Sequence, residues 1–173
     1  MTRVFSNLTE LKAAVGTDLG HSAWLEIDQA RIDRFAEATG DFQWIHVDAE
    51  RANDGPYRRT IAQGYLTLSL WPILFREMVQ VNGVAMAVNY GTEKVRFPAP
   101  VPVGSKIRLG VTIAAVDDVP GGVHCTYRFV LETANADKPA CVVTALIRYF
   151  ATPGGWKSLG IDASKSEVLI SEP

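Results

Sequence analysis

The segment IAQGYLTLSLWPILFREMVQVNG, from Ile61 to Gly83, constrains the fold more than any other part of the chain. Apolar side chains occupy nearly every face of a helix drawn through it, which predicts one long helix over residues 62–81 that is buried on most sides. Pro72 lies inside this segment and removes one backbone hydrogen bond, so we expect the helix to kink or split there. The rest of the chain must surround this helix.

After Gly83 the hydrophobic pattern changes to the alternation of strands. The stretches VAMAVNY and EKVRFPA are strand-like, and three longer stretches each have one apolar face. These three are residues 105–116, 123–133 and 140–150, joined by the short turns DDVPGG and NADKP. The sequence therefore predicts an α+β fold in which an antiparallel sheet wraps around the long helix. The edge of such a sheet favours pairing between subunits.

Shorter elements precede the long helix. We expect a helix at 7–15, a strand at 22–27, and a helix that begins after Asp28 as its N-cap and ends at Gly40. The stretch from Asp41 to Ile45 is expected to form a loop. Asp41 and His46 therefore lie five residues apart, next to this loop.

Composition narrows the class of protein. The chain has 173 residues, of which 47% are hydrophobic and 21% charged, as in an ordinary globular domain. Its formal net charge is −2 and it has no long basic run, which argues against nucleic acid as a partner. Neither a signal peptide nor a segment long enough to cross a membrane is evident. Cys125 and Cys141 lie in apolar strand patterns without metal-ligand spacing, which predicts buried free thiols, no metal site and a cytoplasmic location.

Three stretches resemble a known family: FAEATGDFQWIH, TIAQGYLTLSL and NYGTEKVRFPAPVPVGS. They are similar to the MaoC-type hydratases, which are (R)-specific enoyl-CoA hydratases with the hot-dog fold. The family motif is aromatic-x-x-x-[ST]-G-D-x-N-P-[ILV]-H. It is matched by Phe35, Thr39, Gly40, Asp41, Ile45 and His46, whereas Gln43 and Trp44 replace the asparagine and proline. The resemblance implies one MaoC-like hot-dog domain over residues 1–151 and a C-terminal extension over 152–173, where SEVLIS is a candidate edge strand.

The resemblance also implies the reaction, which is the reversible hydration of trans-2-enoyl-CoA to (R)-3-hydroxyacyl-CoA by a hydro-lyase. This reaction needs a base for water, an acid for the adjacent carbon and a donor for the thioester oxygen. By resemblance, Asp41 and His46 hold and activate the water, and the Gly64 backbone N–H is the donor at the helix start. Gln43 takes the place of the orienting asparagine. A second departure from the family is Gln63, which stands before Gly64 where the family usually has histidine.

Substrate contacts and partners follow from the same resemblance. Trp44 covers the loop or walls the acyl pocket, Tyr65 and Leu66 belong either to the core or to the pocket lining, and Arg96 is a candidate for the CoA phosphates. The expected substrate is an acyl-CoA or acyl carrier protein thioester. No cofactor is expected because CoA arrives with the substrate, and the family implies a homodimer.

Two alternatives remain open. An acyl-CoA thioesterase on the same fold would place a carboxylate on or beside the central helix, whereas this segment has no acidic residue before Glu77. A non-catalytic protein that binds acyl thioesters is the other alternative, which the unusual Gln43, Trp44 and Gln63 favour. Taken singly, Asp41 is also typical of a turn, His46 of a loop and Gly64 of a helix start.

Overall fold

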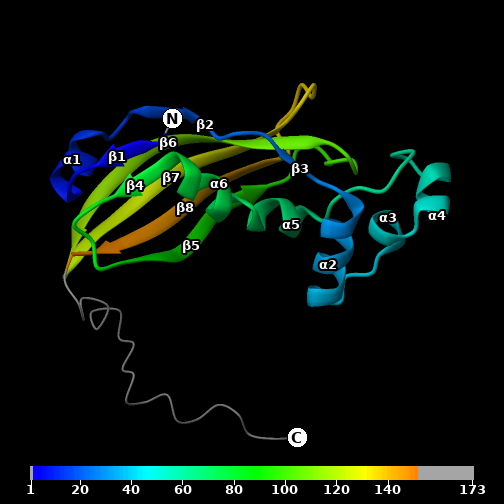
Figure 1. The fold of residues 1–173 in the computed structure, drawn as a ribbon, viewed down its shortest axis with the longest axis horizontal. Coiled ribbons are helices and arrows are strands. Elements are labelled where there is room, and N and C mark those ends of the chain that lie inside the picture. The colour runs from blue at the N-terminus through cyan, green and yellow to red at the C-terminus, as the bar shows by residue number, and fades with distance from the viewer. Residues whose placement is uncertain (1, 152–173) are drawn as a thin grey trace, which may run out of the picture.

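A strongly curved antiparallel sheet forms most of the fold (Figure 1). The computed structural model describes residues 2–151. The strand order of the sheet is β2-β6-β7-β8-β5, and β3 also pairs with β6. These strands are β2 (Asp18–His21), β3 (Leu25–Glu26), β5 (Met86–Arg96), β6 (Lys106–Val119), β7 (Gly122–Thr133) and β8 (Cys141–Phe150).

The three long strands that the alternation predicted are confirmed as β6, β7 and β8, which pair antiparallel in sequence order. Their register aligns the apolar positions: Val111 lies opposite Phe129, which lies opposite Val143. All three side chains are buried. The alternation therefore reflects an inner face that packs on the core and an outer face that does not.

The long helix predicted over residues 62–81 is split into two. α5 (Gly64–Ser69) and α6 (Trp71–Met78) meet at Leu70, and Pro72 occupies the first turn of α6. Because proline has no N–H and its ring crowds the carbonyl four residues earlier, one helix cannot continue through Pro72. The predicted C-terminal end was wrong, since residues 79–81 form β4 (Val79–Val81), which pairs parallel with β1 (Arg3–Phe5).

Aromatic packing holds α6 against the inner face of the sheet. The ring centroids of Trp71 and Phe129 lie 5.0 Å apart, and those of Phe75 and Tyr127 also lie 5.0 Å apart. Trp71 and Phe75 both come from α6, whereas Phe129 and Tyr127 come from β7. The helix is thus fixed to the middle of the sheet by large apolar contacts.

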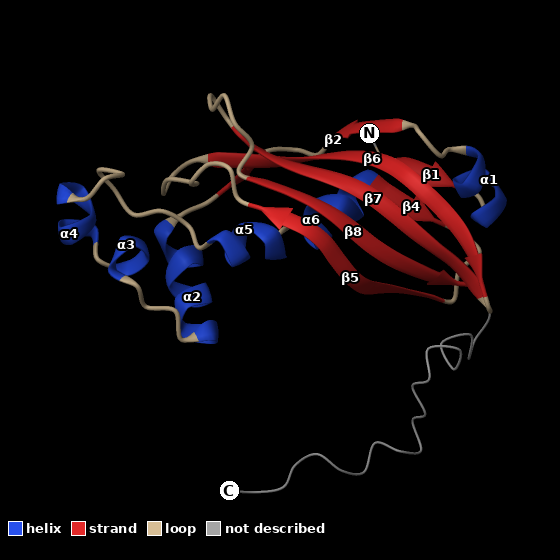
Figure 2. Ribbon diagram, turned by 180° about the vertical axis from the view of Figure 1, so that it is seen from behind, coloured by secondary structure: helices blue, strands red, loops and turns tan. Residues whose placement is uncertain are grey.

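Three of the four remaining helices lie together at one end of the molecule. α2 (Gln29–Thr39), α3 (Trp44–Val47) and α4 (Ala49–Asp54) gather beyond the start of α5, and α1 (Leu8–Ala13) lies at the opposite end (Figure 2). The predicted N-cap of α2 is confirmed, because the Asp28 carboxylate accepts a hydrogen bond from the Arg31 N–H. None of the helices within residues 2–151 is long and apolar enough to cross a membrane.

Other boundaries differ from the predicted ones. The strand expected at 22–27 is only the short β3, and β2 was not predicted. The two strand-like stretches after Gly83 form one strand, β5, whose register shifts twice along β8. The proposed extension at 152–173 and its candidate edge strand lie outside the described residues.

Candidate active site

The end of α2 delivers Asp41 to the site. Gly40 adopts a left-handed conformation with φ of 74°, and its N–H donates to the Ala36 carbonyl. This is a common way for a helix to end, and it turns the chain sharply. Asp41 follows in an exposed loop. The sequence reasoning placed the end of this loop at Ile45, whereas the structure begins the short helix α3 at Trp44, so His46 lies on a helical turn.

His46 is buried, and hydrogen bonds hold both its backbone and its ring. Its backbone N–H donates to the Gln43 carbonyl, and its ring Nδ1 lies 2.7 Å from the Ile61 carbonyl oxygen. A carbonyl oxygen can only accept, so Nδ1 must carry the proton of the neutral ring. The other ring nitrogen, Nε2, is therefore the lone-pair acceptor.

Asp41 faces that free nitrogen. The Asp41 Oδ2 atom lies 4.0 Å from His46 Nε2. This separation is too long for a direct hydrogen bond, but one water molecule can bond to both atoms. The Asp41 side chain is 48% exposed and that of His46 only 8%. Asp41 therefore borders solvent, whereas His46 is enclosed by protein.

A cavity of about 380 Å³ opens beside His46 and the start of α5. Gly64 lies in its wall under the Phe97 ring, where a Cβ would come within 3.1 Å of the ring. As the first residue of α5, Gly64 has an N–H without an acceptor inside the helix. The cavity lining consists of His46, Tyr57, Ile61, Ala62, Gly64, Thr67, Phe97, Pro98, Ala99, Pro100, Val101 and Ala140.

Apart from His46 and Gly64, the predicted site residues, Asp41 included, are not part of that lining. Leu66 is buried in the core. Tyr65 is 70% exposed, and its ring centroid lies 5.9 Å from that of Phe97 in a tilted arrangement. Trp44 turns toward α4, where the Arg51 guanidinium lies 4.6 Å from its ring. Arg96 is exposed, and its side chain donates to the Val95 carbonyl.

The glutamines behave differently from expectation. Among the described residues, the exposed Gln43 side chain has no hydrogen-bond partner. The main-chain carbonyl of Gln43 accepts a hydrogen bond from the His46 N–H. Gln63 is buried, and its Nε2 reaches the Ile32 carbonyl at 3.4 Å, whereas its Oε1 has no partner within residues 2–151. Sequence reasoning missed Gln29, whose amide bonds to the His46 carbonyl, and Thr67, which is buried in the cavity wall. Neither residue belongs to the family motif, so no signal pointed to them.

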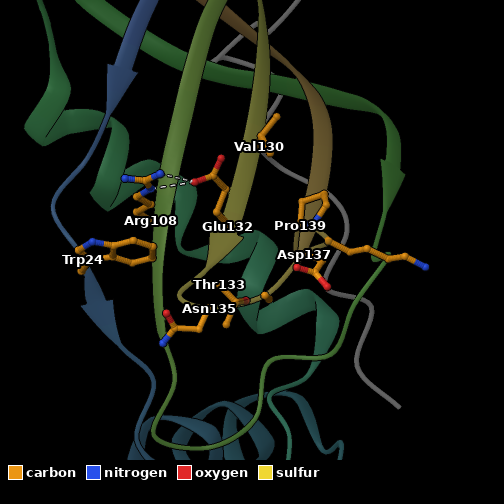
Figure 3. Close-up of a pocket in the computed structure, with 10 residues that line it drawn as sticks. Trp24, Arg108, Val130, Glu132, Thr133, Asn135, Asp137 and Pro139 are labelled. Atoms are coloured by element: carbon orange, nitrogen blue, oxygen red, sulfur yellow. Dashed lines mark hydrogen bonds and ion pairs between the residues drawn. The ribbon is translucent and has the colours of Figure 1, made fainter.

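A second cavity, of about 360 Å³, lies on the outer face of the sheet (Figure 3). Arg108 there makes an ion pair with Glu132 at 2.7 Å and covers the Trp24 ring at 4.7 Å. Burial alone would raise the pKa of Glu132, but the hydrogen bond and charge of Arg108 lower it below its usual value. Since none of the predicted site residues lines this cavity, it is not the candidate active site.

The amino-acid sequence matches a known protein family. The family described as "MaoC like domain" matches residues 10–135. The chain belongs to the MaoC-like dehydratase family. A 3-hydroxyacyl-thioester dehydratase Z from Mycobacterium tuberculosis is 48% identical over 150 residues, which cover 86% of this chain and 99% of that protein.

Solved structures agree at the level of the fold. A MaoC-like dehydratase from Rhodospirillum rubrum superimposes with a TM-score of 0.66 at 24% identity, over 81% of this chain and 94% of that one. The (R)-hydratase from A. caviae involved in PHA biosynthesis gives a TM-score of 0.64 at 22% identity, over 77% and 94% of the chains. These structures show that the chain has the predicted hot-dog fold. The family match and the 48% identical dehydratase show that it is a hydro-lyase.

Proposed function

We propose that this MaoC-like dehydratase catalyses the reversible, (R)-specific hydration of trans-2-enoyl-CoA to (R)-3-hydroxyacyl-CoA. The observation that carries the proposal is the pair of acceptors, Asp41 Oδ2 and His46 Nε2, which lie 4.0 Å apart. His46 also lines the cavity at the start of α5. The homologous 3-hydroxyacyl-thioester dehydratase Z supports a thioester substrate.

Both acceptors suit one water. A water placed between them donates one hydrogen to the Asp41 carboxylate and the other to His46 Nε2. Its oxygen lone pair is then directed away from the pair, where the third carbon of a 2-enoyl thioester would lie. As that C–O bond forms, one of the two groups takes the proton of the water.

The same group then returns a proton to the second carbon. Because base and acid are one pair on one side of the substrate, water and proton add to the same face. Negative charge that builds on the thioester oxygen is proposed to meet the Gly64 N–H at the start of α5. Only water and the substrate enter the balance, so the proposed reaction needs no redox partner or cofactor.

The thioesterase alternative has less support. α5 carries no Asp or Glu, and Glu77 lines a different cavity with His21 and Ser22. A carboxylate there is not available to a substrate beside His46.

We also propose a homodimer and a cytoplasmic location, with acyl-CoA or an acyl carrier protein thioester as the partner molecule. Within the described residues β5 is an edge strand of the sheet. The exposed Tyr90 lies on it, Phe97 follows its last residue, and the exposed ring of Tyr65 lies 5.9 Å from that of Phe97. Buried free thiols at Cys125 and Cys141 are typical of a reducing compartment. Arg96 remains a proposed contact for the CoA phosphates.

A stereochemically resolved hydration assay tests the proposal. The protein is mixed with trans-2-enoyl-CoA substrates of increasing chain length, starting with crotonyl-CoA, and the loss of absorbance of the conjugated thioester is followed. The expected product is the (R)-3-hydroxyacyl-CoA. Release of free CoA without hydration would support the thioesterase instead, and binding without turnover would support the non-catalytic alternative.

A further inference from the structure

The side-chain amide of Gln29, at the start of α2, meets polar groups from three separate places. Its Nε2 donates to the His46 carbonyl at 2.8 Å and to Asp33 Oδ1 at 2.8 Å. Its Oε1 accepts a hydrogen bond of 2.6 Å from the Thr60 hydroxyl. Gln29 therefore makes three short side-chain hydrogen bonds although it is only half-buried.

These partners determine which way the amide points. The His46 carbonyl and the Asp33 carboxylate can only accept, so both need the NH₂ group of Gln29. The Thr60 hydroxyl can donate to the amide oxygen. The reversed amide would place its oxygen against two acceptors, which is unfavourable. The orientation of Gln29 is therefore determined by its surroundings.

Two of the three partners of Gln29 belong to the segments that hold the His46 ring. One is the main chain of His46 itself. The other is Thr60, the residue before Ile61, whose carbonyl accepts from His46 Nδ1. Gln29 thus connects both ends of the bond that selects the histidine tautomer. Gln29 is not among the residues that line the cavity, whereas His46, which its amide contacts directly, is one of them.

We infer that Gln29 is a positioning residue for His46. Its amide holds α3 and the Thr60–Ile61 segment at the spacing that keeps the Nδ1–H bond to the Ile61 carbonyl, and so keeps Nε2 as the acceptor that faces Asp41. This inference rests on the proposed function only for its kinetic consequence, because the tautomer is a property of the free protein.

Substitution of Gln29 should lower kcat more than it changes KM. Gln29→Leu keeps the approximate shape of the side chain but removes all three hydrogen bonds. A displacement of about 1 Å in a reacting group can cost on the order of 100-fold in rate, so we expect kcat to fall by about 10- to 100-fold. KM should change by less than about threefold, since Gln29 does not line the cavity.

Thr60→Val provides a milder variant, and Gln80→Leu a matched control. Thr60→Val removes the donor to Oε1 but leaves the bond from Gln29 to His46, so kcat should fall by less than in Gln29→Leu. Gln80 on β4 is an exposed glutamine whose amide, among residues 2–151, bonds only to Asn82, and its replacement should leave kcat unchanged.

The decisive readout is the side-chain ¹⁵N spectrum of His46 without substrate, assigned by comparison with His46→Gln. The wild-type and Gln80→Leu proteins should show the Nδ1–H tautomer, and Gln29→Leu a mixture of the two neutral tautomers. Folded Gln29→Leu that keeps kcat within about twofold of wild type, or that keeps the wild-type His46 signals, would overturn the inference.

If Gln29→Leu does not fold, the Thr60→Val variant tests the positioning role of Gln29 instead. A partial shift of the His46 signals with a partial loss of kcat supports the positioning role, and unchanged signals overturn it. If the wild-type protein does not hydrate any enoyl-CoA, the proposed function fails, whereas the ¹⁵N spectra still decide the role of Gln29.

Discussion

At the scale of single residues, one contact determines the chemistry that His46 can perform. Its Nδ1 lies 2.7 Å from the Ile61 carbonyl oxygen, so the neutral ring presents Nε2 to Asp41. The resemblance to the family predicted that Asp41 and His46 approach each other. It could not predict the tautomer, because Ile61 is fifteen residues further along the chain.

Substitution of Gln43 tests how much this unusual motif residue affects kcat. Because its side chain has no hydrogen bond within the described chain, Gln43→Asn removes no hydrogen bond and restores the amide that the family carries. We expect kcat for crotonyl-CoA to stay within about a factor of ten of wild type, since only positioning can change. A loss of more than about 100-fold in kcat would contradict this and would give the longer amide a direct role.

The buried thiols predict how stability depends on pH. Burial raises the pKa of Cys125 and of Cys141 from 9.0 to about 11 in each case. The unfolded thiols lose their protons first as pH rises, so their contribution is complete below pH 9 and is lost between about pH 9 and 11. Burial also raises the pKa of Tyr127 and Tyr149, which adds to the same loss.

Urea unfolding between pH 7.5 and 10.5 measures this effect. The free energy of unfolding should be nearly flat up to pH 9 and should then fall. In Cys125→Ala the fall should be shallower, stability at pH 7.5 should be lower by roughly 1 kcal/mol, and kcat should be unchanged. Equal slopes for the variant and the wild type above pH 9 would rule out the thiol as a source of the fall.

At the scale of elements, the sequence predicted those features that depend on local pattern. The alternation at Ile107, Leu109 and Val111 identified β6 because each side chain packs on the same inner face. Pro72 predicted the break between α5 and α6 through its missing N–H. The strand β4 was missed because residues 79–81 continue the apolar helical pattern, and only their pairing with distant β1 makes them a strand.

The start of β7 depends on a glycine. A Cβ on Gly122 would lie 1.8 Å from the Tyr149 carbonyl oxygen on β8, so Gly122→Ala forces two backbones apart. We expect it to cost roughly 3 kcal/mol or more of unfolding free energy, at the upper end of the usual cost of overpacking. Chemical denaturation measures this directly.

Gly91→Ala in β5 is the matched control, because a Cβ there meets no atom within 4 Å and no positive φ is involved. Its effect should stay below about 1 kcal/mol. Similar costs for the two variants would contradict the close approach of β7 and β8 at Gly122.

At the scale of the whole molecule, the site lies where segments distant in sequence converge. α2 supplies Gln29, α3 supplies His46, and the approach to α5 supplies Ile61 and Gly64. The order of helix, sheet and loop could be predicted from the sequence and its resemblance to a family. The bonds from Gln29 could not, because Thr60 lies 31 residues away and neither residue belongs to a recognisable motif.

The proposed homodimer makes a prediction about assembly. Within residues 2–151, β5 pairs only with β8, which leaves one edge of the described sheet open beside the exposed Tyr90 and Phe97. We expect sedimentation velocity at micromolar concentration to give the mass of two chains of 18.9 kDa each. Tyr90→Lys on this strand should shift the distribution toward the monomer, and a wild-type monomer would count against the dimer.

The claim that Asp41 and His46 act as one unit on one water is tested most directly by a double-mutant cycle on kcat for crotonyl-CoA hydration. Asp41→Asn removes the carboxylate charge and His46→Gln removes the titrating ring, so each should lower kcat by roughly 1,000-fold or more while the protein stays folded. The double variant should be only slightly slower than either single variant, because both substitutions disable the same step. Two folded single variants that still hydrate crotonyl-CoA at near wild-type rates, or a double variant whose loss is the product of the two single losses, would contradict the claim.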